Sequence, residues 1–168
     1  MDRQILISLL SQMIGRAVDE KQAQHLLDLG MKPNAQRQEG DGTWSVDLSG
    51  MTRFNDLAIF RGARISRLKL KGTAIADLSD LRGMPLTEIS LSECNNLTKL
   101  SPLAEAKELT SLILPPSPDD IEFLRSLPKL DRLSYSADKV KTWIADKTSA
   151  EFWKKYDAEN AFPTGQSE

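Results

Sequence analysis

One hexapeptide pattern returns three times in this chain, as ISRLKL at 65–70, LTEISL at 86–91 and LTSLIL at 109–114. A weaker copy begins at Leu130 and ends near Tyr135, so that the starts lie 21, 23 and 21 residues apart. Apolar residues recur at the first, fourth and sixth positions of each copy, and the alternation at the end of the first two copies predicts a β-strand with one buried face. A regular period of this length is typical of arrays in which each repeat is one strand with its connecting turn. The sequence therefore predicts strands that stack in chain order.

Five strands follow when the pattern is extended toward the N-terminus. The tripeptide Leu48-Ser49-Gly50 matches Leu70-Lys71-Gly72, so a degenerate first repeat precedes the clear ones. The expected strands lie at about 44–49, 65–70, 86–91, 109–114 and 130–135. About 15 residues separate successive strands, which leaves room for a turn of 3₁₀ helix and not for a long α-helix. The inward leucines of one repeat are buried only by its neighbours, so the repeats are expected to share one core.

Helices are predicted to close the N-terminal end, because the terminal repeats of such a stack expose apolar faces. Apolar residues at helical spacing predict one helix over 2–18. A second helix over 19–29 ends at Gly30, a residue suited to the left-handed turn that closes helices. The polar, glycine-containing stretch 32–43 is interpreted as a loop that leads to the first strand.

The C-terminal end is expected to contain two helices. Val140, Trp143 and Ile144 suggest a short first helix, and the stretch 148–151, TSAE, has the spacing of a capping box at the start of the second. The aromatic residues predicted to pack on the last repeat are Phe152, Trp153 and Tyr156. The resulting division is a helical cap and loop at 1–43, repeats at 44–136, a helical cap at 137–159 and a flexible tail at 160–168, together forming one folded domain.

The composition is that of an ordinary globular protein with little net charge. The chain has 168 residues, of which 40% are hydrophobic and 27% charged, and a formal net charge of -2. This balance gives no overall attraction to nucleic acid, and no exposed aromatic residues are interleaved for base stacking, so no nucleic-acid partner is expected. The early apolar run 5–10 is much shorter than the roughly 20 residues that span a bilayer, and it lacks the pattern of a signal peptide. We therefore expect no membrane insertion, and favour a cytoplasmic location and a monomer.

The repeats resemble those of a known family. Residues 77–91 closely follow the phrase "Asp-Leu-Ser-Pro-Leu-x-Gly-Met-Pro-Leu-Thr-x-Leu-x-Leu" of bacterial leucine-rich repeat proteins. Residues 148–157, TSAEFWKKYD, are similar to the segment that often ends such arrays. The similarity covers about 19–157, and the chain departs from it at 114–118, where three prolines replace the usual turn. The resemblance implies an α/β fold, namely a right-handed solenoid with parallel strands on its concave face, short 3₁₀ or irregular turns on its convex face and helical caps at both ends.

The resemblance also implies protein recognition or scaffolding, and no catalysis. Such arrays occur in multidomain proteins that include membrane-anchored serine/threonine kinases, but this sequence has no kinase glycine-rich loop, catalytic loop or metal-binding triplet. We therefore expect a non-catalytic module that binds a protein partner, with no cofactor and no metal. One alternative is a regulatory or scaffolding domain of a larger signalling protein, and a third is a hydrolase with an unrecognised site.

The candidate binding surface is the outward row of the strands. Alternation places the leucines of 65–70 inward and their neighbours outward on the concave face, which is the usual binding surface of solenoids. The residues expected to determine partner specificity are Arg67, Lys69, Lys71, Glu88, Ser90 and Arg132. Alternatively these charges only pair with one another across strands, since Asp47 would lie beside Lys69 and Arg67 beside Glu88. Both interpretations stay open.

The single cysteine and the single histidine predict no reactive centre. Cys94 follows Leu91 by three residues, which is the asparagine-or-cysteine position of the repeat, so it is expected to be buried and structural. His25 lies in the N-terminal helical region, so that the two residues predict neither a catalytic dyad nor a zinc site. One cysteine also cannot form an internal disulfide.

Overall fold

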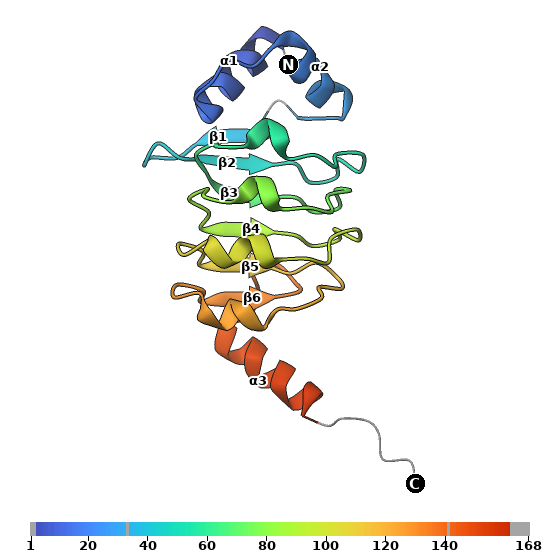
Figure 1. Ribbon diagram of the computed structural model, residues 1–168, viewed down its shortest axis with the longest axis vertical. Coiled ribbons are helices and arrows are strands. Elements are labelled where there is room, and N and C mark those ends of the chain that lie inside the picture. Colours follow the sequence, from blue (N-terminus) through green and yellow to red (C-terminus); the bar gives the residue numbers. More distant parts are fainter. Residues whose placement is uncertain (1–2, 33, 141, 162–168) are drawn as a thin grey trace.

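The computed structural model describes residues 3–32, 34–140 and 142–161, and these have an α/β fold. One six-stranded sheet has the order β1-β2-β3-β4-β5-β6; the strands are parallel from β2 onward, and β1 runs antiparallel to β2. The strands are β1 (Gln36–Gln38), β2 (Trp44–Asp47), β3 (Ile65–Lys69), β4 (Glu88–Ser90), β5 (Ser111–Ile113) and β6 (Arg132–Ser134). Figure 1 shows them stacked in chain order, with α1 (Arg3–Ile14) and α2 (Glu20–Asp28) at one end and α3 (Ser149–Asn160) at the other.

Short 3₁₀ turns connect the parallel strands, as the repeat spacing predicts. The turns are Ala58–Phe60, Ser79–Leu81, Ser101–Glu105 and Glu122–Ser126. At the start of three of them, an aspartate side chain accepts a hydrogen bond from the backbone amide two residues ahead. These pairs are Asp56 with Ala58, Asp77 with Ser79, and Asp120 with Glu122. The bond holds the chain in a turn, which is the physical reason for the aspartate that recurs before an apolar residue in the sequence.

The core consists of aliphatic rows that cross the strands. The register pairs Leu68 with Ile89, Ile89 with Leu112 and Leu112 with Leu133, and none of these side chains is exposed. A second buried row lies two residues further along the chain in each unit and contains Leu48, Leu70, Leu91 and Leu114. Burying one such side chain contributes about 1.5–3 kcal/mol. Each strand therefore depends on the next one for the burial of its leucines.

A left-handed backbone turn follows each of β2, β3 and β4. Gly50 and Gly72 occupy this position with φ of 79° and 69°. The equivalent residue after β4 is Glu93, which adopts a φ of 60° although it carries a side chain. For a residue with a Cβ this conformation costs about 1–2 kcal/mol. The unit that contains β4 thus carries backbone strain that its two predecessors avoid with glycine.

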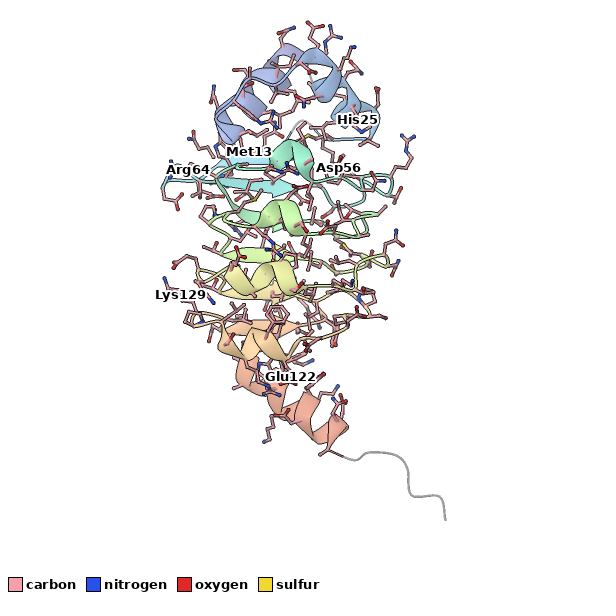
Figure 2. All side chains as sticks on the ribbon, viewed as in Figure 1. Met13, His25, Asp56, Arg64, Glu122 and Lys129 are labelled. Carbon is pink, nitrogen blue, oxygen red and sulfur yellow. The ribbon has the colours of Figure 1, made fainter. Side chains whose placement is uncertain are left out.

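The two N-terminal helices pack at the β1 end of the sheet. α2 begins with a capping box, in which Asp19 accepts a hydrogen bond from the Gln22 amide at 2.8 Å, and Gly30 follows it with the predicted left-handed φ. The large apolar side chains that the helices bury include Leu6, Leu10, Met13 and Leu26. The carbonyl of Met13 accepts a hydrogen bond from the amide of Arg64 at 3.2 Å, which joins α1 to the start of β3 (Figure 2).

The final helix begins where the sequence predicts it. The hydroxyl of Thr148 accepts a hydrogen bond from the Glu151 amide at 3.2 Å, and the Glu151 carboxylate accepts one from the Thr148 amide at 2.9 Å. Phe152 and Trp153 are buried in the common core, and the Arg125 guanidinium lies 3.8 Å from the centre of the Trp153 ring. The predicted aromatic contact between α3 and the last repeat is therefore confirmed.

The chain also covers the outer edge of β6 before it enters α3. The amide of Leu133 donates to the carbonyl of Lys147 at 3.1 Å, and the amide of Ser149 donates to the carbonyl of Asp131 at 2.7 Å. Arg132 and Thr148 form an antiparallel bridge between these bonds. The last strand thus has hydrogen-bonding partners on both sides.

The stretch 32–43 differs from its prediction as a loop, because it contains β1. This strand pairs with β2 as a hairpin, and the turn is closed by the Glu39 amide, which donates to the Thr43 carbonyl at 2.8 Å. The residues of β1 are Gln-Arg-Gln, so no apolar alternation marks it. Its pairing comes from backbone bonds and from the turn around Asp41-Gly42, a dipeptide that favours hairpins.

The short helix predicted around Val140, Trp143 and Ile144 is wrong. Residues 137–140 and 142–147 form no helix, and Ala137 pairs with Ala145 as an antiparallel bridge. The apolar residues do not share one buried face, since Val140 is 88% exposed whereas Trp143 contacts the sheet. The predicted tail begins inside α3, which ends at Asn160, and residues 162–168 lie outside the described part of the chain.

Candidate functional site

The outward row of the sheet brings most of the predicted site residues together. Five of them lie on or just after two neighbouring strands: Arg67, Lys69 and Lys71 at β3, and Glu88 and Ser90 on β4. Arg132 belongs to the same row at a greater distance, since Glu88 pairs with Ser111 and Ser111 pairs with Arg132. The candidate surface therefore spans four strands.

Arg67 is the centre of a charge network on this surface. Its Nε lies 2.8 Å from Oε2 of Glu88, and its Nη1 lies 3.8 Å from Oε1 of Glu39. Glu39 follows β1 directly and also accepts a hydrogen bond from the hydroxyl of Ser45. The cross-strand pair of Arg67 and Glu88 that alternation predicts is present. The second carboxylate comes from the hairpin that the sequence analysis interpreted as a loop.

Lys69 is more enclosed than its neighbours, with 12% of its side chain exposed, against 52% for Lys71. Its Nζ donates to the hydroxyl of Thr142 at 2.9 Å and lies 3.9 Å from Oδ2 of Asp47, the other cross-strand partner that the sequence predicts. Burial lowers the pKa of the Lys69 ammonium below its ordinary value; the carboxylate of Asp47 opposes this shift and the charge of Arg67 adds to it.

A segment between β6 and α3 lies across the row, and we call residues 137–140 and 142–147 the strap. Trp143 is the strap side chain that covers the cations. The centre of its ring lies 4.8 Å from Cζ of Arg67 and 4.4 Å from Nζ of Lys69. Cation–π contacts of this kind contribute about 0.5–2 kcal/mol, depending on how far the cation is removed from water. Part of the predicted binding row is therefore occupied by the chain itself.

Hydrogen bonds hold the strap at further points. The amide of Ala145 donates to the hydroxyl of Ser111 on β5 at 2.9 Å, and the Ala145 side chain is fully buried. Two further bonds join the Asp138 amide to the Ile144 carbonyl within the strap at 2.7 Å, and the Asp146 amide to the Ser136 carbonyl at its base at 3.0 Å. The strap thus contacts β3 through side chains, β5 through the Ala145 amide and β6 through the Lys147 carbonyl, which accepts the hydrogen bond of Leu133.

Ser90 and Arg132 offer less surface than the sequence analysis expects of contact residues. Ser90 is 3% exposed, and its hydroxyl lies 3.3 Å from that of Ser92. Arg132 is half-buried near Glu151. The hydrogen bonds from Thr148 lower the pKa of the Glu151 carboxyl, and the charge of Arg132 acts in the same direction. These two residues therefore stabilise the surface and expose little area to a partner.

A cleft of ≈ 520 Å³ opens beside the strap, at the ends of β2, β3 and β4. Its walls carry two ammonium groups, two carboxylates and several hydroxyls, including those of Lys69, Lys71, Asp47, Glu93, Ser92 and Thr142. Charges of both signs balance here, so the cleft matches a polar surface of mixed charge better than a simple anion. Tyr135, which also lines the cleft, is 46% exposed and adds an accessible aromatic ring.

The other titratable candidates lie away from this row. His25 and Asp56 line a separate cleft of ≈ 230 Å³ between α2 and the first 3₁₀ turn, where Figure 2 labels both. Cys94 is fully buried, its thiol donates to the carbonyl of Leu70 at 3.0 Å, and burial raises its pKa. This agrees with the structural role predicted for it. In the part of the chain that the structure describes, no group of three His, Cys, Asp or Glu side chains is placed to hold a metal ion.

Three residues of this site were not predicted as members of it: Trp143, Thr142 and Glu39. The signal for Glu39 is the Asp41-Gly42 dipeptide, which indicates a hairpin and would bring the preceding residues beside β2. The signal for the strap is weaker. Trp143 is an aromatic residue in a lysine-rich segment, next to a predicted row of outward cations, and no local rule states that the two meet.

No family model matches the chain, and no curated protein gives a significant match. Over the described residues, the helices are too short and too polar to cross a bilayer.

Proposed function

We propose that this chain is a non-catalytic protein-interaction module, built as a right-handed leucine-rich repeat solenoid and binding a protein partner through the outward face of its sheet. The architecture is supported by parallel strands in chain order, which short turns connect and which contribute to the same aliphatic rows. A repeat period of 21–23 residues fits this class of array.

The observation that carries the proposal is the single polar row of Arg67, Lys69 and Glu88 in register, beside the cleft at the strand ends. Strands of a parallel sheet lie about 4.8 Å apart, so one extended surface can contact side chains from several units at once. The more accessible members are held by ion pairs that contribute little, typically about 0–1 kcal/mol. A partner can therefore exchange these pairs for its own at small cost, while their geometry provides specificity.

The experiment is an affinity capture with three immobilised proteins. The first is the wild type, and the second carries Arg67→Glu, Lys69→Glu and Lys71→Glu on the candidate surface. The third carries Arg82→Glu, Lys107→Glu and Lys129→Glu, which make the same change in net charge in the connections between strands. Circular dichroism and urea unfolding verify that each variant is folded. Captured proteins are identified and the binding is repeated with purified components.

The proposal predicts a partner that the wild type and the control variant retain and the surface variant loses. The affinity between the purified components should fall at least tenfold with the surface variant and change less than threefold with the control variant. Only the surface variant alters residues of the contact row. Equal retention by all three proteins contradicts the assignment of the sheet face. Loss with the control variant alone would instead place the partner on the connecting turns.

A further inference from the structure

The strap occupies the central part of the proposed binding row with a small set of contacts. Trp143 lies against Arg67 and Lys69, Thr142 accepts the hydrogen bond of the Lys69 ammonium, and the Ala145 amide donates to Ser111. These groups form a compact pattern of one aromatic ring, one hydroxyl and one backbone N–H. The pattern is displayed by three residues within four consecutive positions of the chain.

Little apolar burial holds this segment in place. Among its described residues Ala145 is the one that is fully buried, while Thr142 and Asp146 are exposed. Val140, an apolar side chain, is 88% exposed. Segments with few buried apolar contacts open locally at a free energy well below that of global unfolding. The strands beneath the strap, by contrast, carry fully buried aliphatic rows.

We infer that the strap is a displaceable lid, and that Arg67 and Lys69 form a receptor site for an aromatic side chain of a partner peptide, which Trp143 occupies in the closed state. The inference rests on the proposed function, because it assumes that the outward face binds protein. The partner segment carries an aromatic residue with a hydroxyl residue directly before it and a free backbone N–H two residues after it, in the arrangement of the strap.

The chemistry of the pair favours an aromatic occupant. Two cations lie within 5 Å of one ring centre. The face of an aromatic ring is electron-rich and attracts both, whereas an aliphatic side chain would cover them without electrostatic compensation. Glu88 pairs with Arg67 and Asp47 lies near Lys69, and both cations still contact the ring of Trp143. The hydroxyl of Ser111 can accept a hydrogen bond from a backbone N–H of an extended segment, as it does from Ala145.

Competition with the strap determines the apparent affinity. A ligand that binds only the open form is weakened by the fraction of molecules that are open. If about one molecule in ten is open, removing the Trp143 ring should raise the affinity for such a peptide about tenfold. In the wild type the strap then blocks the site formed by Arg67 and Lys69. Weak ligands are excluded, and only a ligand that binds this site more tightly than the strap does can displace it.

The test uses the peptide DKVKTWIADK, which has the sequence of residues 138–147, and the same peptide with Trp143→Ala. Binding of both fluorescently labelled peptides is measured by anisotropy with the full wild-type chain and with the full chain carrying Trp143→Ala. We expect the variant to bind the tryptophan peptide at least tenfold more tightly than the alanine peptide, and about tenfold more tightly than the wild type does. Equal binding of the two peptides by the variant, no binding of either, or equal affinity of wild type and variant for the tryptophan peptide overturns the inference.

Hydrogen exchange of the wild-type protein tests the lid without any substitution. The strap amides of Asp138, Ala145 and Asp146 are hydrogen-bonded and should exchange at least tenfold faster than the sheet amides of Leu70 and Leu91, after correction for intrinsic rates. Equal protection of strap and sheet overturns the lid. This readout applies even if the Trp143→Ala chain does not fold.

The two proposals fail in different ways. Peptide binding to the opened face, with no protein retained through that face in the affinity experiment, would overturn the proposed function and support the aromatic site. Capture of a partner through Arg67 and Lys69, with no binding of the tryptophan peptide to the variant, would overturn the aromatic site and leave the proposed function standing.

Discussion

Replacing Leu91 by aspartate is expected to destabilise the fold strongly. The Leu91 side chain is fully buried, and its amide donates to the carbonyl of Ile113 at 2.9 Å, so the residue is held between two neighbouring units. Losing the leucine costs about 1.5–3 kcal/mol of burial. A carboxyl in the same place must be protonated, which at pH 7 costs about 4 kcal/mol from a reference pKa of about 3.9. The combined loss of about 5.5–7 kcal/mol is comparable with the lower part of the roughly 5–15 kcal/mol of total stability that such domains have.

Urea unfolding followed by circular dichroism measures this effect in Leu91→Asp and in Leu91→Asn. The asparagine side chain has nearly the same shape as that of aspartate but no ionisable group. Burial raises the pKa of the introduced carboxyl in the folded state, so the penalty is absent below about pH 3.9 and grows as the pH rises. We expect the two variants to agree near pH 4 and Leu91→Asp to be less stable by up to about 4 kcal/mol at pH 7.

Ser92→Asp provides the control, because it adds the same charge to the adjacent, half-buried position on the outward face. It should change the free energy of unfolding by no more than about 1 kcal/mol. A Leu91→Asp protein with the transition of the wild type would refute the burial of this side chain. A difference between the aspartate and asparagine variants that does not depend on pH would refute the origin assigned to the penalty.

Three further predictions concern the cap of α3, the left-handed turn at Glu93 and the strap. Thr148→Ala removes the hydroxyl that caps α3 and should lower the free energy of unfolding by about 1 kcal/mol, whereas Thr148→Ser should keep most of it; equal urea midpoints would contradict the cap. Glu93→Gly relieves the left-handed backbone and should raise the free energy of unfolding by up to about 1 kcal/mol, a gain that Glu93→Ala should not give. Trp143→Ala uncovers Lys69, whose pKa burial lowers, so that pKa should rise toward its ordinary value in an NMR titration of the lysine signals; an unchanged pKa would show that the ring does not enclose the ammonium.

The regular part of the fold follows from local patterns in the sequence. The alternation at 65–70 predicts both β3 and the burial of Leu68 and Leu70, because a strand has a period of two and its buried face must be apolar. The capping box at Thr148 predicts the start of α3 to the residue, since hydroxyl and carboxylate meet the first amides of a helix only at this spacing. These patterns are decided by neighbours a few residues apart.

The parts that sequence reasoning missed depend on tertiary contacts. β1 has the polar sequence Gln-Arg-Gln and becomes a strand because β2 offers it backbone partners. Trp143 and its apolar neighbours have helical spacing, but the segment gains more from placing the ring on Arg67 and Lys69 than from a short helix with Val140 on the outside. The cross-strand neighbours Asp47 with Lys69 and Arg67 with Glu88 were predicted correctly, whereas the partial cover of their row by the strap was not predicted.

Both edges of the sheet are closed to further strands. On one side, β1 is three residues long, polar and antiparallel, so it offers few unpaired amides and carbonyls in the direction that β2 to β6 would extend. On the other side, the backbone around Thr148 already pairs with β6. Exposed edges are where sheet proteins join into aggregates and fibres. A chain whose strands repeat one phrase would be at particular risk of pairing with copies of itself, and these two short segments stop the array at its own ends.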